Sequence, residues 1–325
     1  MKSTTKILYI ERDDTTFTPH QDIPAVFQGQ LIPYARFYYH EDKDGSILDQ
    51  NIRAGEFSIW VHSIQMRPGV ELRHYSQYQV ITLHAYDDVE SMRGTINNRQ
   101  QLEKEVSLFN VMASAEPTLP GSSQPLSFHI NIEPYALREL AREFPLLSAL
   151  AAIPISNVTE PLHKAPFLLN PVSRLIRDRI LRAKHIGNSA YSFFRRNAAD
   201  FYGNYTRRLI APAPIMMNEA KRQQLYEIFR YILNHLDEPL TYKMLQQKFG
   251  VEEALLRRPF EQEFHLTIPE LVLQEKMAVA FEMLSTRNTP VTTIMDQLGF
   301  TCLSTFLTTF DKYFKYGALQ VMDAQ

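Results

Sequence analysis

Short segments in which apolar and polar residues alternate occupy the first third of the chain. Because successive side chains of a strand point to opposite faces of a sheet, this alternation predicts half-buried β-strands. Runs of turn-forming residues at 42–46, 67–69 and 120–123 separate the segments. Short strands at this spacing predict a sandwich or a barrel. The predicted strands cover residues 6–10, 57–65, 78–85, 106–113 and 126–132.

From residue 134 onward, apolar residues recur three and four positions apart, which is the spacing of one face of a helix. Residues 135–150 are predicted to form one helix, and residues 166–210 a helix pair that carries many arginines. Pro212 and Pro214 cannot continue a helix, so the segment 211–214 is predicted to be a linker.

Two similar pairs of short helices are predicted after this linker. Asn218 and Thr241 are helix-capping residues, and Gly250 and Gly299 stand where short helices end. Two short helices joined by a glycine-containing turn form a helix-turn-helix. Pro259 removes a backbone hydrogen bond from its helix unless it lies near a kink. The first pair covers 242–249 and 252–264, the second covers 291–297 and 303–314, and a helix at 269–284 connects them.

Length and composition are those of an ordinary globular protein of two domains. The chain has 325 residues, of which 45% are hydrophobic and 22% are charged. A single cysteine, Cys302, excludes an internal disulfide and a cysteine-rich metal site, and it favours a reducing cytoplasm. The first ten residues lack the apolar core of a signal peptide, and the most apolar stretch is too short to cross a bilayer. We therefore expect a cytoplasmic protein without a membrane partner.

Particular residues mark the two helix pairs. In the first pair Leu256 and Phe260 stand four apart, and in the connecting helix Lys276 stands four residues before Ala280. The second pair has two apolar residues three apart, a Gly-Phe turn and two phenylalanines four apart, namely Val291, Ile294, Leu298, Gly299, Phe300, Phe306 and Phe310. This block resembles the AraC/XylS family of bacterial transcription regulators. The β-rich first half followed by a middle segment is similar to the siderophore-responsive branch of that family.

The resemblance implies an α+β fold, with an N-terminal β-barrel or cupin-like domain and an all-α domain that contains two helix-turn-helix units. A recognition helix in the major groove can place an arginine against guanine or against phosphate. His265 and Lys315 stand where family members usually have the glycines that end the recognition helices. The positions that the resemblance assigns to DNA contact are Ala254, Arg257, Arg258, Leu303, Ser304 and Thr308, with Thr305 and Lys312 beside them.

Charge leaves a second interpretation open. Residues 220–325 contain eleven Lys and Arg against thirteen Asp and Glu, which does not favour a grip on phosphates. Pairing of Glu253 with Arg257, and of Arg258 with Gln262, would make an ordinary solvated helix face. The alternative is therefore a degenerate relative whose C-terminal block is a protein-interaction module. The basic block is 171–210, with nine Lys and Arg against two Asp.

Other chemistries find less support in the residues. His62, His74 and His84 could meet inside a barrel, but no metal-ligand spacing is present, and we expect neither a metal nor a cofactor. A cupin-like enzyme lacks its ligand triad, and no nucleophile or phosphate-binding motif occurs, so we expect no catalytic residues and no enzyme. The aromatic residues Trp60, Tyr78 and Tyr86 are candidates for lining a ligand pocket, although aromatics at strand spacing usually belong to a core.

The resemblance implies a sequence-specific DNA-binding transcription regulator that is controlled by a signal sensed in its N-terminal domain. Residues 1–133 form the sensing domain, 134–210 a helical linker or dimerisation segment, and 211–325 the AraC-like DNA-binding domain. The expected partners are double-stranded DNA, a small-molecule effector, RNA polymerase and a second copy of the chain.

Overall fold

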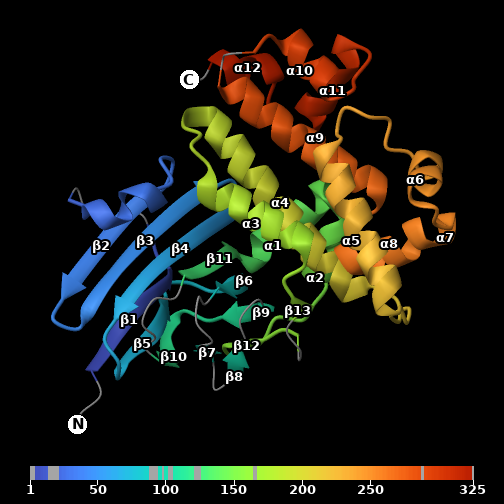
Figure 1. Cartoon of the computed structure of the whole chain (residues 1–325). Coiled ribbons are helices and arrows are strands. Elements are labelled where there is room, and N and C mark those ends of the chain that lie inside the picture. Colours follow the sequence, from blue (N-terminus) through green and yellow to red (C-terminus); the bar gives the residue numbers. More distant parts are fainter. Residues whose placement is uncertain are drawn as a thin grey trace. The chain divides into compact units, whose positions relative to one another are not determined.

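The computed structural model of the chain describes residues 4–13, 22–87, 94–96, 99–101, 105–120, 126–163, 167–286 and 289–323. The backbone divides into two compact units (Figure 1). The N-terminal unit comprises residues 1–169 and 177–184, and the C-terminal unit comprises 170–176 and 185–325. This division follows backbone compactness alone, so the three functional segments inferred from the sequence stay a prediction.

The N-terminal unit contains two main β-sheets and a small one. In the first sheet β1 (Thr4–Glu11) pairs in parallel with β5 (Val70–Ser76), which pairs antiparallel with β10 (Ser114–Pro120). The second sheet has eight antiparallel strands, which curve side by side in Figure 1. Along this sheet the order is β12 (Glu160–Pro161), β9 (Glu105–Val111), β6 (Val80–Asp87), β11 (Leu126–Ile132), β4 (Phe57–Met66), β3 (Gly45–Ala54) and β2 (Arg36–Asp42).

Shorter elements complete this unit. The strand β13 (Phe167–Leu168) also pairs with β9, and β7 (Gly94–Ile96) pairs with β8 (Arg99–Gln101). A 3-10 helix covers Ala25–Gln30. All five predicted strands are confirmed, with ends that differ by at most about two residues. The predicted turn at 42–46 joins β2 to β3, and Gly45 is required there because a Cβ atom would lie 2.1 Å from the Gln65 carbonyl oxygen.

The single helix expected at 135–150 is wrong. The structure has α1 (Pro134–Glu143), a 3-10 turn (Pro145–Leu147) and a short α2 (Ser148–Ala151). Pro145 has no backbone N–H to donate, and it biases Phe144 away from helical angles. Phe144 accordingly has φ −117° and ψ 83°, which ends α1. Four apolar residues of this segment, Leu137, Leu140, Ala141 and Leu147, are nevertheless buried.

The C-terminal unit is helical within its described residues. The predicted caps are confirmed, since the side chains of Asn218 and Thr241 accept backbone N–H groups, and Gly250 and Gly299 have φ of 62° and 65°. The helix α3 (Pro171–Arg182) contributes its first residues to this unit. The remaining helices are α4 (Gly187–Ile210), α5 (Glu219–Asn234), α6 (Tyr242–Phe249), α7 (Glu253–Leu256), α8 (Arg258–Phe264), α9 (Ile268–Ser285), α10 (Val291–Gln297), α11 (Leu303–Phe314) and α12 (Ala318–Asp323).

The helix expected at 252–264 is also interrupted, because α7 and α8 are separated at Arg257. Arg257 has φ −96° and ψ −111°, which lie outside the helical region. Pro259 is the cause, since it cannot donate to the carbonyl of Leu255 and occupies the first turn of α8, where a proline is tolerated. The predicted α+β fold class, with a β-rich first domain and an all-α domain that contains two helix-turn-helix units, is confirmed.

His265 and Lys315 end α8 and α11 in the left-handed conformation, with φ of 56° and 54°. Glycine adopts this conformation without steric cost, whereas other residues are strained by about 1 to 2 kcal/mol. These two side chains therefore end the helices at a cost that glycine would avoid.

Replacement of Lys315 by glycine should stabilise the chain by about 1 kcal/mol, because it relieves the left-handed strain at the C′ position. The matched control is Lys312→Gly, three residues earlier inside α11, which should destabilise by about 1 kcal/mol. Urea unfolding of both variants checks the opposite signs. A loss of stability in Lys315→Gly would contradict the argument.

Candidate functional site

The two helix-turn-helix units are held by buried aromatic residues. Phe260 and Phe306 have no exposed surface, and Phe264 stacks on Phe229 of α5 at 4.5 Å between ring centroids. In the second unit Phe310 stacks on Phe281 of the connecting helix α9 at 5.9 Å. Because residues four apart share one helix face, burial of these rings turns the residues between them toward solvent.

All eight residues that the sequence assigns to DNA contact are exposed in the structure. On α11, Ser304, Thr308 and Lys312 are spaced four apart in an unbroken helix, so they form one stripe. The exposed set is Ala254, Arg257, Arg258, Leu303, Ser304, Thr305, Thr308 and Lys312. Exposure makes these residues available, and their contact with DNA stays a prediction.

In the first unit the two arginines rest on the surface of their own unit. The Arg257 guanidinium donates to Glu253 at 2.9 Å and lies over the Tyr242 ring at 4.6 Å. Arg258 donates to the carbonyl of Ala213 at 3.2 Å. The predicted Glu253–Arg257 pair is therefore confirmed, whereas Gln262 bonds to the backbone of Ile215. Either arginine must leave these surface contacts to reach a base or a phosphate.

The basic block is partly structural. Arg196 on α4 pairs with Asp200 at 2.7 Å and lies 3.6 Å from the centroid of the Tyr313 ring. Arg207, also on α4, pairs with Glu270 at the start of α9. These contacts join α4 to both α9 and α11, so this helix supports the two helix-turn-helix units. The charges of Arg196 and Arg207 are already paired with carboxylates, so these two side chains are not positioned to bind a phosphate.

A polar cluster fixes the end of α8. Asn170 donates to Asn204 at 2.9 Å and to Nδ1 of His265 at 2.8 Å, and Asn204 donates to the carbonyl of Phe264 at 3.0 Å. Since Nδ1 accepts this bond, His265 is neutral in this geometry. Burial, together with the nearby Arg208 and Arg207, lowers the pKa of His265 to about 4.

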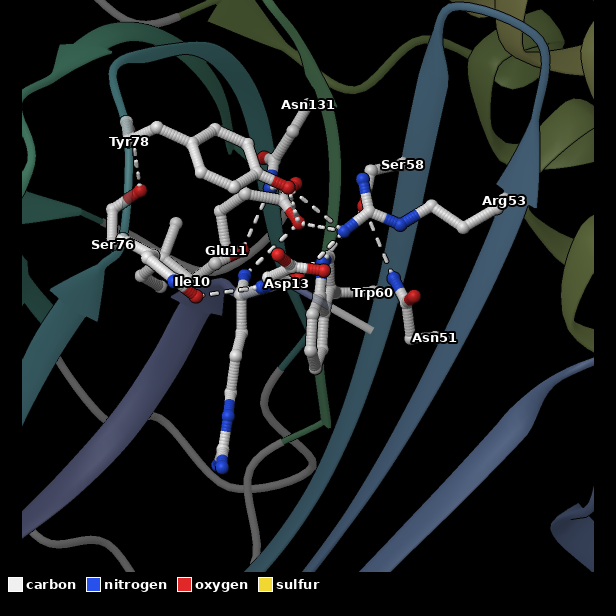
Figure 2. Close-up of polar contacts among 12 residues, drawn as sticks. Ile10, Glu11, Asp13, Asn51, Arg53, Ser58, Trp60, Ser76, Tyr78 and Asn131 are labelled. Atoms are coloured by element: carbon white, nitrogen blue, oxygen red, sulfur yellow. Dashed lines mark hydrogen bonds and ion pairs between the residues drawn. The ribbon is translucent and has the colours of Figure 1, made fainter. Parts of the chain in front are cut away.

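The interior of the N-terminal unit contains a buried carboxylate. Figure 2 shows Glu11 of β1 among Arg53, Tyr78 and Asn131. Glu11 accepts from Arg53 at 2.5 Å and from the Asn131 amide at 2.9 Å, and the Tyr78 hydroxyl lies 3.4 Å away. Glu11 is 1% exposed, so these donors compensate a charge that burial would otherwise disfavour. The cluster ties β1 to β3 and β11 of the larger sheet.

Two of the predicted ligand residues bond to other residues of this interior. Trp60 is 1% exposed, donates to Ser58 at 2.9 Å and stacks on His62. The Tyr78 hydroxyl accepts from Arg53 at 3.0 Å, and burial raises the pKa of Tyr78. The side chain of Tyr86 lies outside the described part of the chain. Trp60 and Tyr78 thus hold the domain together in this structure, and a ligand role for the three residues stays a prediction.

Histidines do meet inside the sheet, although not as a metal centre. His62 and His84 both approach His129, which the sequence interpretation missed. Nε2 of His62 lies 2.8 Å from Nε2 of His129. Among the described residues no group of three His, Cys, Asp or Glu side chains could hold a metal ion. His129 lies in the predicted strand 126–132, where polar residues alternate with apolar ones. The polar residues on one face of this strand were the signal that could have pointed to His129.

A pocket of about 420 Å³ opens beside these histidines. It is lined by the strands β1, β2 and β3 and by Arg12 just beyond β1. Asp49 is the lining residue that reaches the histidines, since its carboxylate lies 2.6 Å from Nδ1 of His62. The other polar or aromatic lining residues include Lys6, Tyr9, Tyr38, Tyr39 and His40.

Comparison with known proteins matches the C-terminal unit. Residues 245–321 match the family described as a helix-turn-helix domain. The chain is 28% identical to the regulatory protein SoxS of Salmonella typhimurium over 93 residues, which is 29% of this chain and 87% of SoxS. It is 27% identical to SoxS of Escherichia coli strain K12 over 90 residues, 28% of this chain and 84% of SoxS.

Solved structures are matched only at low similarity. The C-terminal domain of the response regulator yesN from Fusobacterium nucleatum is 24% identical, covers 32% of this chain and 99% of its own, and has a TM-score of 0.29. ToxT from Vibrio cholerae with a bound unsaturated fatty acid is 10% identical, covers 84% of this chain and 96% of its own, and also has a TM-score of 0.29.

The C-terminal region is therefore a helix-turn-helix domain, the class of module by which transcription regulators bind DNA. More particularly, it is a domain of the AraC/XylS type, so the resemblance found in the sequence is confirmed for this region. The matched relatives are regulatory proteins and not enzymes, as predicted. No helix in the described residues is long and apolar enough to span a bilayer.

Acid should weaken the end of α8 through His265. The folded pKa of about 4 lies below the ordinary value of about 6.5, so the unfolded chain takes up a proton first as the pH falls. The stability contributed by neutral His265 is thus present above pH 6.5 and is lost between about pH 6.5 and 4, by up to about 3 kcal/mol.

The variant His265→Asn tests this, because asparagine tolerates the left-handed conformation and does not titrate. Its stability relative to the natural chain should rise as the pH falls from 7 to 4 in denaturant titrations. A difference between the two chains that stays constant over this range would contradict the assignment.

Proposed function

We propose that the chain is a sequence-specific DNA-binding transcription regulator controlled by a signal sensed in its N-terminal domain. Residues 211–325 bind DNA, 134–210 link the domains and form a homodimer, and 1–133 sense the signal. The observation that carries the proposal is that α8 and α11 each have two different faces. The phenylalanines on one face are buried, and the predicted contact residues on the other are exposed.

The second unit is proposed to supply a DNA-contacting surface that needs no rearrangement. Ser304, Thr305 and Thr308 offer hydroxyl groups that can bond to either kind of base edge, and Leu303 can contact a thymine methyl group. Lys312 lies two turns further along α11 and is placed to meet a phosphate. This surface needs no prior rearrangement, because α11 is continuous from Leu303 to Phe314.

The first unit is proposed to bind DNA by exchanging the protein contacts of its two arginines for contacts with DNA. Arg257 gives up Glu253, and Arg258 gives up the Ala213 carbonyl, for guanine or phosphate oxygens. Exposed ion pairs contribute little to stability, so this exchange costs little. Ala254 lies on the adjoining turn, where a small side chain permits close approach.

The N-terminal unit is proposed to bind a small-molecule effector. The pocket of about 420 Å³ is of the size that small ligands occupy, and it combines tyrosines with charged groups. A ligand role for Trp60, Tyr78 and Tyr86 stays a prediction from the sequence, and Trp60 and Tyr78 do not line this pocket. A homodimer would present two copies of the DNA-binding domain to paired half-sites, and contact with RNA polymerase would convert binding into regulation.

The double variant Arg257→Ala with Arg258→Ala should lower affinity for a selected operator by about 30-fold or more, since each good base contact is worth about 1 to 3 kcal/mol. The operator is first obtained by selecting bound fragments from the host genome, and affinity is then measured by fluorescence anisotropy. The matched control is Lys221→Ala with Arg230→Ala, which removes two exposed cations from α5. Equal affinity in the Arg257/Arg258 variant and this control would contradict the site.

Salt dependence separates the two roles proposed on α11. The variant Lys312→Ala should reduce the slope of log affinity against log salt by about 0.9, because one phosphate contact is lost. Ser304→Ala should lower affinity for the operator without changing this slope. If no genomic fragment binds the full chain at any salt concentration, the protein-interaction module replaces the regulator as the function.

A further inference from the structure

A chain of hydrogen bonds runs through the interior of the N-terminal unit, from Asp49 at the pocket to Asn131. Nδ1 of His62 lies 2.6 Å from the Asp49 carboxylate, and Nε2 of His62 lies 2.8 Å from Nε2 of His129. Nδ1 of His129 lies 2.9 Å from the Asn131 side-chain oxygen. His62, His129 and Asn131 have no exposed surface, so protein atoms alone must satisfy this chain.

The direction of the chain is fixed at Asn131. Its amide nitrogen donates to the carbonyl of Ile10 at 2.7 Å and to the Glu11 carboxylate at 2.9 Å, so the other amide atom is the oxygen and accepts. Nδ1 of His129 must therefore carry a hydrogen and donate it to Asn131. This leaves only Nε2 of His129 free of a hydrogen if the ring is neutral.

The surroundings of His129 favour its neutral form. Burial, together with the nearby His62, His84 and His74, holds the pKa of His129 well below its ordinary value. Neutral His129 with its hydrogen on Nδ1 accepts at Nε2, so Nε2 of His62 must donate. The Nδ1 atom of His62 then faces Asp49 at 2.6 Å, a distance that requires a hydrogen between them.

We propose that the Asp49–His62 pair is a proton-binding site at the base of the pocket, and that it holds one proton more than an ionised aspartate beside a neutral histidine. The proton is present whether it is drawn on the histidine, as imidazolium and carboxylate, or on the aspartate, as two neutral groups. Loss of the proton would set a carboxylate against the lone pair of Nδ1 and break the contact.

The site is placed to exchange its proton with solvent. Nine-tenths of the Asp49 side chain is buried, and the remainder opens into the pocket. Lys6 and Arg12 line the same pocket, so a carboxylate freed from His62 has cations to turn toward. Other ionisable groups line the pocket or lie near the chain of hydrogen bonds, namely Tyr9, Glu11, Tyr38, Tyr39, His40, Arg53, His74 and His84. Lys6 already pairs with Asp42 and Asp44, and the Arg12 guanidinium lies over the Tyr9 ring.

The role of this site in regulation rests on the proposed sensing function. A pocket whose base changes shape on losing a proton binds its effector in a proton-linked way. Proton binding by the folded chain is measurable without DNA or effector, so it can be tested separately from the regulator proposal.

The test compares the pH dependence of unfolding of the full chain with that of Asp49→Asn between pH 7 and 9. The side-chain amide of asparagine can donate to Nδ1 of His62, so this variant keeps the chain of bonds without the stored proton. Above about pH 6.5 the folded state of the natural chain holds one proton that its unfolded state lacks. A rise in pH therefore favours the unfolded state of the natural chain. The ratio of its unfolding constant to that of Asp49→Asn should rise by up to about tenfold per pH unit.

The matched control is Asp42→Asn on the neighbouring strand. The Lys6 ammonium holds the pKa of Asp42 at about 2, so this carboxylate is ionised over the whole range and its loss should leave the pH slope of the natural chain unchanged. Parallel slopes for the natural chain and Asp49→Asn would overturn the proposal. If Asp49→Asn fails to fold, NMR of the natural chain decides: above pH 7 a proton on Nε2 of His62 together with a second proton between Nδ1 and the Asp49 carboxylate supports the site, and the loss of either proton refutes it.

A second measurement concerns regulation alone. Operator affinity should depend on pH in the natural chain more steeply than in Asp49→Asn. If unfolding shows the proton while operator affinity has the same pH dependence in both chains, the coupling of this site to regulation is refuted and the DNA-binding proposal is unaffected.

Discussion

Burial of phenylalanines on the short helices of the C-terminal unit decides which residues face outward. Phe260 and Phe264 on α8, and Phe306 and Phe310 on α11, are completely buried. A helix whose aromatic face is fixed in this way has little freedom to rotate, since rotation would expose rings that each bury a large apolar area. The exposed stripe on α11 and the exposed arginines between α7 and α8 follow from this constraint.

Polar contacts then position these helices with a precision that apolar packing alone does not give. Asn170 and Asn204 hold the end of α8, while Arg196 of α4 reaches Tyr313 of α11. The connecting helix α9 has 18 residues and is therefore about 27 Å long.

Much of this arrangement could be predicted from the sequence because local signals agree with the fold. Capping residues, glycines and the spacing of phenylalanines located every helix from α9 to α11 within about two residues. The failures lie where a proline outweighed periodicity, at Pro145 and Pro259. The strand β3 was missed because its inward face is polar, with Asp49 and its neighbours paired inside the unit, and pairing across strands is invisible in a single sequence.

The central claim is that both helix-turn-helix units contact DNA, and hydroxyl-radical footprinting of the full chain on a selected genomic fragment tests it most directly. The account predicts two protected segments on one face of the duplex, about one helical turn apart, for each copy of the DNA-binding domain. A single protected segment per copy, or no protection on fragments that the chain retains, would contradict it.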